Sequence, residues 1–538
     1  MIRILCVTEA SFLNTGYAVY FKQLIQELVK NPNYDVAEFA CYAAPTDPKI
    51  YEVPWKLFCN SPDPNNAAEV EQYESSKQNA FGIWKFESVC LEFKPHIVLS
   101  IRDYWMDAFI DSSPYRRYFK WIWMPTVDAY PQNEQWVDMY NRCDAILTYN
   151  DWSGSVLLHQ SNNKIKWAGS APPIADVAYK PKDKAAIKKS LGFDENSKII
   201  GTVMRNQKRK LFPDLFMAFR KYLDMTGDNN TYLYCHTSYP DGGWDIPHYL
   251  KEHNICNKTL FTYVCEKCGQ VFPSFFHDAV TFCPKCAQPS ATMAHVHNGA
   301  TPDVLADIYN LFDIYVQYAN SEGFGIPLVE AAACGTPIMA INYSAMSDIL
   351  VKLDGIPVNV LTLITELETG CMRAAPDNDD CADKFRQLLD LTPEQRQAIG
   401  ERTRQLWIEN YSLDKTVSQW VKCIELVNPD ENSWESPPRI HEPKTNPPAN
   451  MNNKEFVRWL LVNVLGEPER LNSYMELRMT RDLNFSVSIG SMYGMYFNEN
   501  TIFFDRPEHH KFTHEDAYNQ MRMLCERSNY WEKARCGI

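Results

Sequence analysis

Short apolar runs alternate with stretches of helical periodicity along most of the chain. Runs of four to eight apolar residues, each followed by apolar positions at helical spacing, are typical of buried parallel strands and their crossover helices. The pattern therefore predicts an α/β fold built on open parallel sheets. The predicted strands cover Ile2 to Thr8, Pro95 to Ile101, Lys120 to Met124, Cys143 to Thr148, Ile199 to Met204, Thr231 to His236, Asp313 to Gln317 and Pro337 to Ile341.

Proline-rich segments divide this pattern into two domains and a C-terminal appendage. Pro172-Pro173 and Tyr179-Lys180-Pro181 mark a boundary, so we expect domains over residues 1–178 and 179–428. Residues 429–450 are rich in Pro, Asn and Glu and are expected to form a linker. The remaining residues, 451–538, would pack on the core, form an oligomer contact or hold the acceptor.

Two less regular parts of the chain, residues 51–78 and the appendage, also have predicted elements. We expect loop and helix in the first of these segments and, within the appendage, three helices and one hairpin. Loop and helix are expected over 51–78, the three helices over 455–465, 474–481 and 515–533, and the hairpin over 485–505.

The stretch from Asn320 to Ala340 carries the most chemistry. It reads as loop, helix and strand, with Gly323 and Gly325 before a helix that Gly335 ends. A glycine loop at a helix N-terminus presents backbone N–H groups that suit a phosphate. Glu322 and Glu330 suit hydroxyl groups instead, so the combination fits a sugar attached to a nucleoside diphosphate. The glycines alone fit an ordinary capped helix equally well.

A basic loop precedes another predicted helix. Arg205 to Lys210 holds four cations in six residues, directly before a helix from Phe212 to Leu223. Guanidinium groups bind phosphate bidentately and an ammonium adds a point charge, so we expect an anion here. A solvated basic turn is the alternative. Near the N-terminus, Gly16 follows the first strand, where it would line a ligand or simply serve a turn.

The sequence E-G-F-G-I-P-L-V-E-A-A-A-C-G-T-P, from Glu322 to Pro337, resembles the E-x7-E signature of retaining glycosyltransferases of family 4. The resemblance implies the GT-B fold, with two Rossmann-like domains facing a cleft, and a nucleotide diphosphate sugar held mainly by the second domain. It assigns Glu322 to the donor sugar and Glu330 to the nucleotide ribose. Arg205 and Lys210 would contact the diphosphate.

The resemblance also completes the expected site. The donor-binding set implied by it is Gly16, Arg205, Lys210, Glu322, Gly323, Phe324, Gly325 and Glu330. Arg205, Lys210 and Glu322 would be catalytic, and no catalytic metal is expected because the cations take its place. Leu211 replaces the glycine that usually follows the lysine.

The acceptor side is less defined. Asp103 and Asp128 follow predicted strands, and ligands bind at the carboxyl edge of open α/β sheets. Both would otherwise be loop caps, and many family members have His near the position of Asp103. The acceptor remains open among polysaccharide, lipid-linked sugar, protein and modified DNA bases.

Two C-x2-C pairs interrupt the second domain. Cys265 with Cys268, and Cys283 with Cys286, are separated by fourteen residues. Each pair can aim two thiolates at one ion, so we predict a structural Zn²⁺ ribbon over residues 262–292, with no open position for catalysis. A redox pair is the alternative. Because zinc ribbons often touch nucleic acid, modified DNA stays among the acceptors.

Composition limits the classes of function. The chain has 538 residues, a net charge of −14 and 17 cysteines, an odd number. The acidity argues against an overall nucleic-acid coat. No apolar run reaches the ~18 residues of a membrane span, and we expect a cytoplasmic location. Two alternative functions stay open. One is a sugar-nucleotide epimerase or hydrolase of the same fold, and the other is an inactive transferase core that binds protein or nucleic acid.

Overall fold

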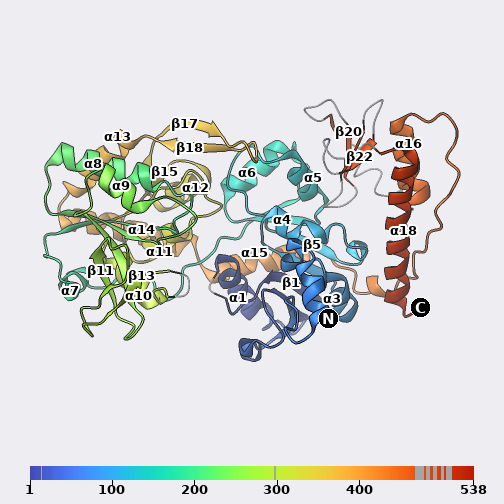
Figure 1. Ribbon diagram of the computed structural model, residues 1–538, viewed down its shortest axis with the longest axis horizontal. Coiled ribbons are helices and arrows are strands. Elements are labelled where there is room, and N and C mark those ends of the chain that lie inside the picture. Colours follow the sequence, from blue (N-terminus) through green and yellow to red (C-terminus); the bar gives the residue numbers. More distant parts are fainter. Residues whose placement is uncertain are drawn as a thin grey trace.

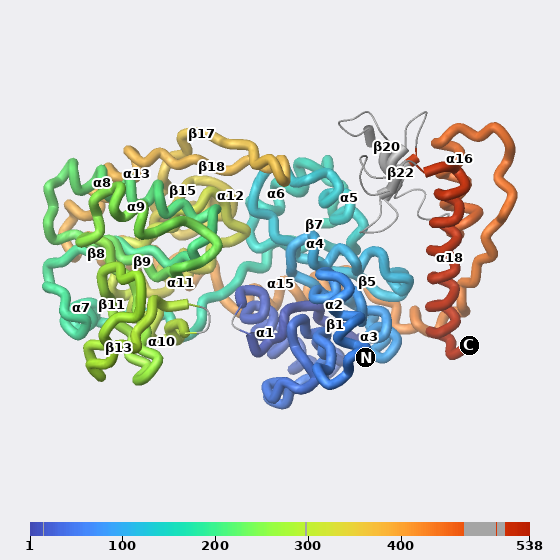
Figure 2. Tube along the Cα trace, in the orientation of Figure 1, coloured from blue at the N-terminus to red at the C-terminus, as the bar shows by residue number. Residues whose placement is uncertain are grey.

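The computed structural model describes residues 1–13, 15–295, 298–466, 478–479, 485–488, 494–497, 502–504 and 512–538. Two α/β lobes lie side by side, and a C-terminal extension lies against the N-terminal lobe on the side away from the C-terminal lobe (Figures 1 and 2). No helix within the described ranges is long and apolar enough to cross a bilayer.

The N-terminal lobe contains a parallel sheet with the strand order β3-β2-β1-β4-β5-β6-β7. Its central strands are buried along most of their length because helices cover both faces. The strands are β1 Ile2–Glu9, β2 Tyr34–Cys41, β3 Lys56–Cys59, β4 Ile97–Ser100, β5 Lys120–Trp123, β6 Ala145–Thr148 and β7 Trp167–Ser170. The α-helices are α1 Gly16–Leu28, α2 Ala67–Glu74, α3 Phe86–Phe93, α4 Tyr104–Asp107, α5 Glu134–Arg142 and α6 Asp151–Gln160.

The C-terminal lobe repeats this architecture. Its parallel strands have the order β10-β9-β8-β14-β15-β16, and an antiparallel ribbon extends the sheet beyond β10. The strands are β8 Lys198–Val203, β9 Thr231–His236, β10 Thr259–Cys265, β14 Ile314–Gln317, β15 Ile338–Ile341 and β16 Ile356–Val358, and the ribbon strands are β11 Val271–Phe275, β12 Thr281–Phe282 and β13 Pro289–Met293. The helices are α7 Lys184–Ser190, α8 Phe212–Thr226, α9 Ile246–Glu252, α10 Pro302–Leu311, α11 Ile326–Ala333 and α12 Ser344–Leu353.

The chain then returns to the N-terminal lobe. A hairpin of β17 Val360–Thr365 and β18 Met372–Pro376 is followed by α13 Asn378–Leu389, α14 Pro393–Asn410 and α15 Leu413–Leu426. Helix α15 packs against α1 and β7 of the N-terminal lobe, where Trp420 Nε1 donates to Tyr20 Oη at 2.7 Å (Figure 1). The buried Trp420 ring also meets the Phe21 ring edge-on, so the end of the C-terminal lobe is fixed to α1.

The apolar pattern predicted this alternation of strands and helices, and both sheets are confirmed. The prediction for residues 51–78 is wrong in part, because this segment contains the strand β3 before its helix. β3 pairs in parallel with β2 at the sheet edge and is only partly buried, so it lacks the continuous apolar run that marks the central strands.

The appendage agrees in part with its prediction. It contains α16 Asn453–Trp459, which continues as a π-helix over Leu460–Val464, and α18 His514–Cys536. Three antiparallel strands, β20 Phe485–Ser488, β21 Gly494–Phe497 and β22 Ile502–Phe504, occupy the predicted hairpin. A helix was predicted over 474–481, yet Arg478–Met479 form strand β19 on β20; the rest of that segment lies outside the described residues.

The segment predicted as a linker, 429–450, is anchored to the N-terminal lobe. Trp434 is 2% exposed, lies against the rings of Tyr115 and Tyr118, and donates from Nε1 to Pro95 O at 2.7 Å. Arg535 of α18 donates to Trp434 O at 2.6 Å. The same tryptophan therefore holds both the segment and the C-terminal helix on the lobe.

We predict that Trp434→Ala lowers the stability of the N-terminal lobe by about 3–5 kcal/mol, because a large buried aromatic side chain is lost. Calorimetric or fluorescence-detected thermal unfolding measures the change. Tyr51→Ala, at a side chain that is 84% exposed, is the control and should change stability by less than about 0.5 kcal/mol. Equal midpoints for the Trp434 variant and the native protein would contradict the anchoring role.

Candidate functional site

A cavity of about 490 Å³ lies between the two lobes. It opens at the carboxyl ends of β8 and β14, which are neighbours in the C-terminal sheet although other strands separate them in sequence. Ligands of open α/β sheets bind at such a switch point in strand order. The predicted site residues that line the cavity are Gly16, Arg205, Lys210, Glu322, Gly323, Phe324 and Gly325.

Lys210 and Glu322 form a buried ion pair at the centre of the site. Their side chains are 8% and 7% exposed, and Lys210 Nζ donates to Glu322 Oε1. The same oxygen accepts from Gln317 Nε2 at 2.7 Å. The loop from β8 is fixed beside β14 because Leu211 N donates to Tyr318 O at 2.9 Å. Strand pairing therefore places the basic loop and the first glutamate in contact.

Two arginines add positive charge around this pair. Arg205 is 57% exposed and binds Asp241 through two hydrogen bonds of 2.9 and 3.1 Å, which lowers the pKa of that carboxyl to about 2. Arg209 Nη2 lies 3.7 Å from Glu322 Oε2. Burial and the Arg209 guanidinium lower the pKa of Lys210. An incoming anion would oppose both effects and favour the charged ammonium.

The glycines before α11 serve two separate purposes. Gly325 has φ = 109°, a conformation that favours glycine, and it caps α11 without a side-chain hydrogen bond to the first turn. A Cβ on Gly323 would stand 2.5 Å from Thr126 Cγ2 of the opposite lobe. Gly323 O also accepts from Asn150 Nδ2 at 2.9 Å. One glycine thus exposes the helix N-terminus, and the other permits close approach of the lobes.

Glu330, four residues into α11, does not line the cavity. Its Oε2 accepts from Tyr309 Oη at 2.7 Å, and Tyr179 is a second hydrogen-bonding neighbour. Burial raises the pKa of Glu330 to about 7, although these tyrosine hydrogen bonds oppose the rise. The second glutamate of the motif is therefore engaged by two phenol groups in this conformation.

The two predicted acceptor-side aspartates lie beside the cavity on the N-terminal lobe. Asp103 is hydrogen-bonded to Tyr17 and Thr126, both of which line the cavity, and burial raises its pKa to about 6. Asp128 Oδ2 accepts from Arg373 Nη1 at 2.8 Å across the lobe boundary. Carboxylates from one lobe and a guanidinium group from the other thus meet at the lobe boundary next to residues that line the cavity.

Several residues of the site carry no clear signal in the sequence or were given no role from it. Glu9 ends β1 and also lines the cavity, so the strand-end argument that selected Asp103 could have found it. Arg209 stands inside the basic run but had no assigned role. Arg373 belongs to β18 and reaches Ser321 Oγ at 2.6 Å, and nothing in its local sequence indicates that contact.

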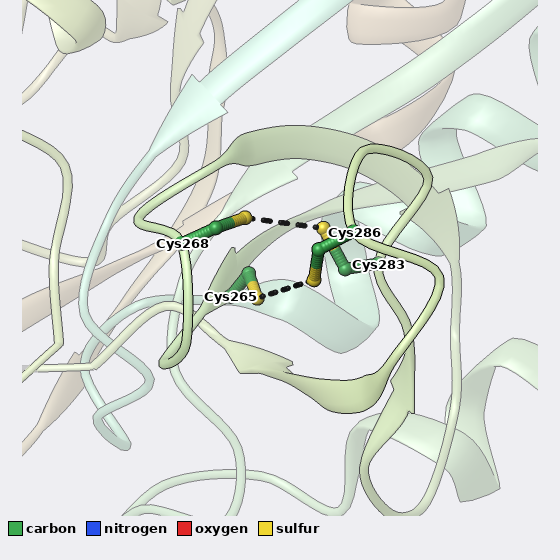
Figure 3. A group of neighbouring side chains, drawn as sticks. All are labelled: Cys265, Cys268, Cys283 and Cys286. Carbon is green, nitrogen blue, oxygen red and sulfur yellow. Dashed lines mark hydrogen bonds between the residues drawn. The ribbon is translucent and has the colours of Figure 1, made fainter.

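The four predicted cysteines of the ribbon converge at one point (Figure 3). Their Sγ atoms all lie within 4.8 Å of one another, with Cys265 to Cys286 at 3.7 Å and Cys268 to Cys283 at 3.6 Å. Four thiolates about 2.3 Å from one zinc ion stand roughly 3.8 Å apart in a tetrahedron. The arrangement is compatible with a structural zinc ion.

We predict that Glu330→Gln becomes more stable relative to the native protein as the pH rises. The native carboxyl has its pKa raised from 4.5 to about 7, so the folded state binds more protons than the unfolded state in this window and loses stability on ionisation. The difference should grow between about pH 4.5 and 7 by at most ~3 kcal/mol. Unfolding at pH 5 and pH 8 measures it.

Glu368→Gln serves as the control for this comparison because Glu368 is exposed. The change in the stability difference between the two pH values should be larger for Glu330→Gln than for Glu368→Gln. A Glu330→Gln difference that is no more sensitive to pH than that of the control would show that the buried carboxyl does not titrate as described.

Residues 291–406 match the family model described as Glycosyl transferases group 1. Among curated proteins, the chain is 24% identical over 286 residues to the D-inositol 3-phosphate glycosyltransferase of Rhodococcus jostii (strain RHA1), covering 52% of this chain and 53% of the relative. It is 30% identical over 131 residues to the N-acetyl-alpha-D-glucosaminyl L-malate synthase of Bacillus anthracis, covering 24% of this chain and 30% of that protein. The chain thus spans about half the length of the first relative and less of the second.

Solved structures extend the likeness to both lobes. The sucrose-phosphate synthase of Thermosynechococcus elongatus has a TM-score of 0.56 at 14% identity, over 79% of this chain and 99% of that chain. Anabaena Alr3699/HepE in complex with UDP has a TM-score of 0.53 at 12% identity, over 79% of this chain and 100% of that chain. Together with the group 1 domain and the named relatives, this likeness supports a transferase with the GT-B fold.

Proposed function

We propose that the protein is a retaining glycosyltransferase that moves a sugar from a nucleotide diphosphate sugar to an acceptor hydroxyl. The observation that carries the proposal is the convergence of Arg205, Lys210, Glu322 and the α11 N-terminus on one interlobe cavity. Cations and helix amides suit a diphosphate, and a carboxylate suits sugar hydroxyls. UDP in the similar Anabaena structure is consistent with such a donor.

The leaving group would be stabilised by charges that are already in position. Departure of the diphosphate develops negative charge, which Lys210, Arg205 and the open first turn of α11 would meet without a metal ion. Arg205 would exchange its bonds with Asp241 for bonds to phosphate oxygens, and its exposure leaves it free to do so. One preorganised donor of this kind contributes about 3 kcal/mol to transition-state stabilisation.

Glu322 would position the sugar. An incoming donor separates the Lys210–Glu322 pair, so that the ammonium binds phosphate and the carboxylate accepts from sugar hydroxyls. The bond from the anomeric carbon to the phosphate oxygen then breaks while the bond to the acceptor oxygen forms on the same face. The acceptor proton passes to the departing diphosphate oxygen, and no enzyme nucleophile takes part.

Glu330 would serve the nucleotide ribose, as the family resemblance implies. In the present conformation Tyr309 holds its carboxyl. Donor binding would then require the tyrosine to share or release this oxygen. The pKa near 7 means that the group reaches its full acceptor capacity only above neutral pH.

The acceptor would enter beside Asp103 and Asp128. Asp103 with Tyr17 and Thr126 offers a carboxyl and two hydroxyls, and Arg209 and Arg373 face them from the other lobe. Charges of both signs suit a polar acceptor with several hydroxyls. Contacts across the boundary, including Lys352 Nζ to Asp151 Oδ2 at 2.8 Å, keep the lobes closed and limit hydrolysis by water.

We predict that a nucleotide sugar raises the thermal unfolding midpoint and that Lys210→Ala and Glu330→Ala abolish this stabilisation. Lys210→Ala should also reduce turnover by roughly 10²–10³-fold, since it removes a charge aimed at the leaving group. A thermal-shift screen of nucleotide sugars, followed by mass spectrometry with polysaccharide, lipid-linked, protein and modified-DNA acceptors, measures both quantities.

Lys208→Gln is the matched control because Lys208 belongs to the same loop but lies over the Trp244 ring, 4.6 Å from its centroid. It should keep the stabilisation and the turnover. Full turnover by both the Lys210 and Glu330 variants would refute the proposed site. Release of free sugar without any acceptor would instead identify a hydrolase.

We further propose that the ribbon over residues 262–292 holds one structural zinc ion through Cys265, Cys268, Cys283 and Cys286. The ribbon continues β10 of the C-terminal sheet, so the ion would fix the end of a strand that also belongs to the lobe's core. Four thiolates close the coordination sphere and leave no position for substrate.

Metal analysis should find about one zinc per chain in protein purified without chelator. Cys268→Ser should release the metal and lower the unfolding midpoint of the C-terminal lobe. Cys256→Ser, at an exposed cysteine outside the group, should retain the metal and leave the unfolding midpoint unchanged. Metal-free native protein with an unchanged midpoint would remove the zinc assignment.

A further inference from the structure

A second cavity, of about 740 Å³, opens on the C-terminal lobe. It is lined by Lys198, the first residue of β8, by Asp313, which precedes β14, and by Pro337, which precedes β15. These positions are the amino ends of three neighbouring strands, and the carboxyl ends of two of them, β8 and β14, carry the donor site. We call it the amino-edge cavity, and it lies on the opposite edge of the sheet from Lys210 and Glu322.

The lining of the amino-edge cavity has an excess of positive charge, in a chain whose net charge is −14. Six lysines and arginines line it against four aspartates and glutamates. Two of these cations pair with carboxylates outside the lining, Lys182 with Asp307 and Lys198 with Asp228, and the other four carry the excess. The cations are Lys182, Lys184, Lys188, Lys198, Arg396 and Arg404. Three of the four carboxylates, on Asp183, Glu195 and Glu401, belong to exposed residues, where solvent and salt screen them.

Positive charge exceeds negative charge more strongly in the buried part of the cavity than at its rim. Asp313 is 4% exposed and faces three cations: Lys188 Nζ at 3.3 Å, Lys184 Nζ at 3.4 Å and Arg396 Nε at 3.8 Å. Its Oδ2 also accepts from Ile199 N at 2.9 Å. One carboxylate cannot neutralise three cations, of which Lys188 and Arg396 are buried and Lys184 is part-exposed. About two positive charges of this group therefore have no ion-pair partner among the residues that the structure describes.

We propose that the amino-edge cavity binds a small phosphate-bearing anion, distinct from the sugar donor. A volume of this size holds a small metabolite. Lysines and arginines supply the charge and the hydrogen-bond donors that phosphate oxygens require. Lys184, whose side chain is 38% exposed, and Arg404 of α14 are the cations placed to meet it from two different helices.

Helix α11 connects this cavity to the donor site. Its first residues, Ile326 and Pro327, line the donor cavity, whereas Cys334 and Gly335 directly after it line the amino-edge cavity. Arg404 Nη1 donates to Ala333 O in the last turn of α11. An anion that draws Arg404 away would therefore act on the helix whose N-terminus faces the donor diphosphate.

Lysine footprinting with inorganic pyrophosphate tests the proposal on the native protein. Acetylation rates are measured by mass spectrometry at increasing pyrophosphate concentration. Lys182 and Lys184 should be protected by at least threefold, and the exposed Lys189, which lies on α7 with Lys184, should react at an unchanged rate. Unchanged rates at both Lys182 and Lys184 at saturating pyrophosphate would overturn the proposal.

Calorimetric titration of variants provides the second measurement. Lys184→Gln/Arg404→Gln should weaken pyrophosphate binding at least tenfold in an Arg205→Gln background, which removes a cation of the proposed donor site. Lys189→Gln/Arg402→Gln alters the same two helices outside the cavity and should bind normally. Binding unaffected by Lys184→Gln alone and by the double variant would contradict the site, whereas loss only on Arg205→Gln would place the anion in the donor cavity.

Discussion

The burial of Lys210 against Glu322 is the interaction on which the site depends. Removing two charges from water is costly, and a buried pair in proteins often adds little net stability. Here the pair occurs where β8 and β14 meet, at the point where strand order departs from chain order. A ligand with phosphate at one end and hydroxyls at the other would satisfy both charges separately. The pair is therefore best understood as a site held ready for such a ligand.

Closure of the lobes completes this arrangement. Contacts from Arg373 to Asp128 and from Asn150 to Gly323 join residues more than 170 positions apart in sequence. They bring the polar side of the N-terminal lobe against the charged edge of the C-terminal lobe. Helix α15 crosses back to the N-terminal lobe, packs against α1 and β7, and gives the two lobes a second connection. The same closure that forms the cavity would exclude water during transfer.

Much of the fold follows from local sequence, because buried parallel strands carry continuous apolar runs and helices begin at recognisable caps. Elements without these signals were missed or misassigned: β3 is a short, half-exposed edge strand, and Arg478–Met479 pair with a neighbouring strand instead of continuing a helix. The anchoring of 429–450 was also missed, since Trp434 finds its pocket only among residues more than 300 positions away.

The candidate site was predictable to the extent that it lies on single motifs. Local residue types indicate the ligand chemistry of two segments, Arg205 to Lys210 and Glu322 to Glu330. Strand pairing then brings Lys210 to Glu322. Arg373 and the tyrosine partners of Glu330 depend on tertiary packing, which no local pattern encodes. The ribbon is the opposite case, because thiolate spacing alone predicted the convergence of four sulfur atoms.

A crystal structure with an intact, non-transferable nucleotide sugar analogue tests the central claim most directly. We expect the Lys210–Glu322 pair to separate, with Lys210 Nζ within hydrogen-bond distance of a diphosphate oxygen and Glu322 accepting from a sugar hydroxyl. An analogue bound elsewhere, with the pair still intact, would contradict it.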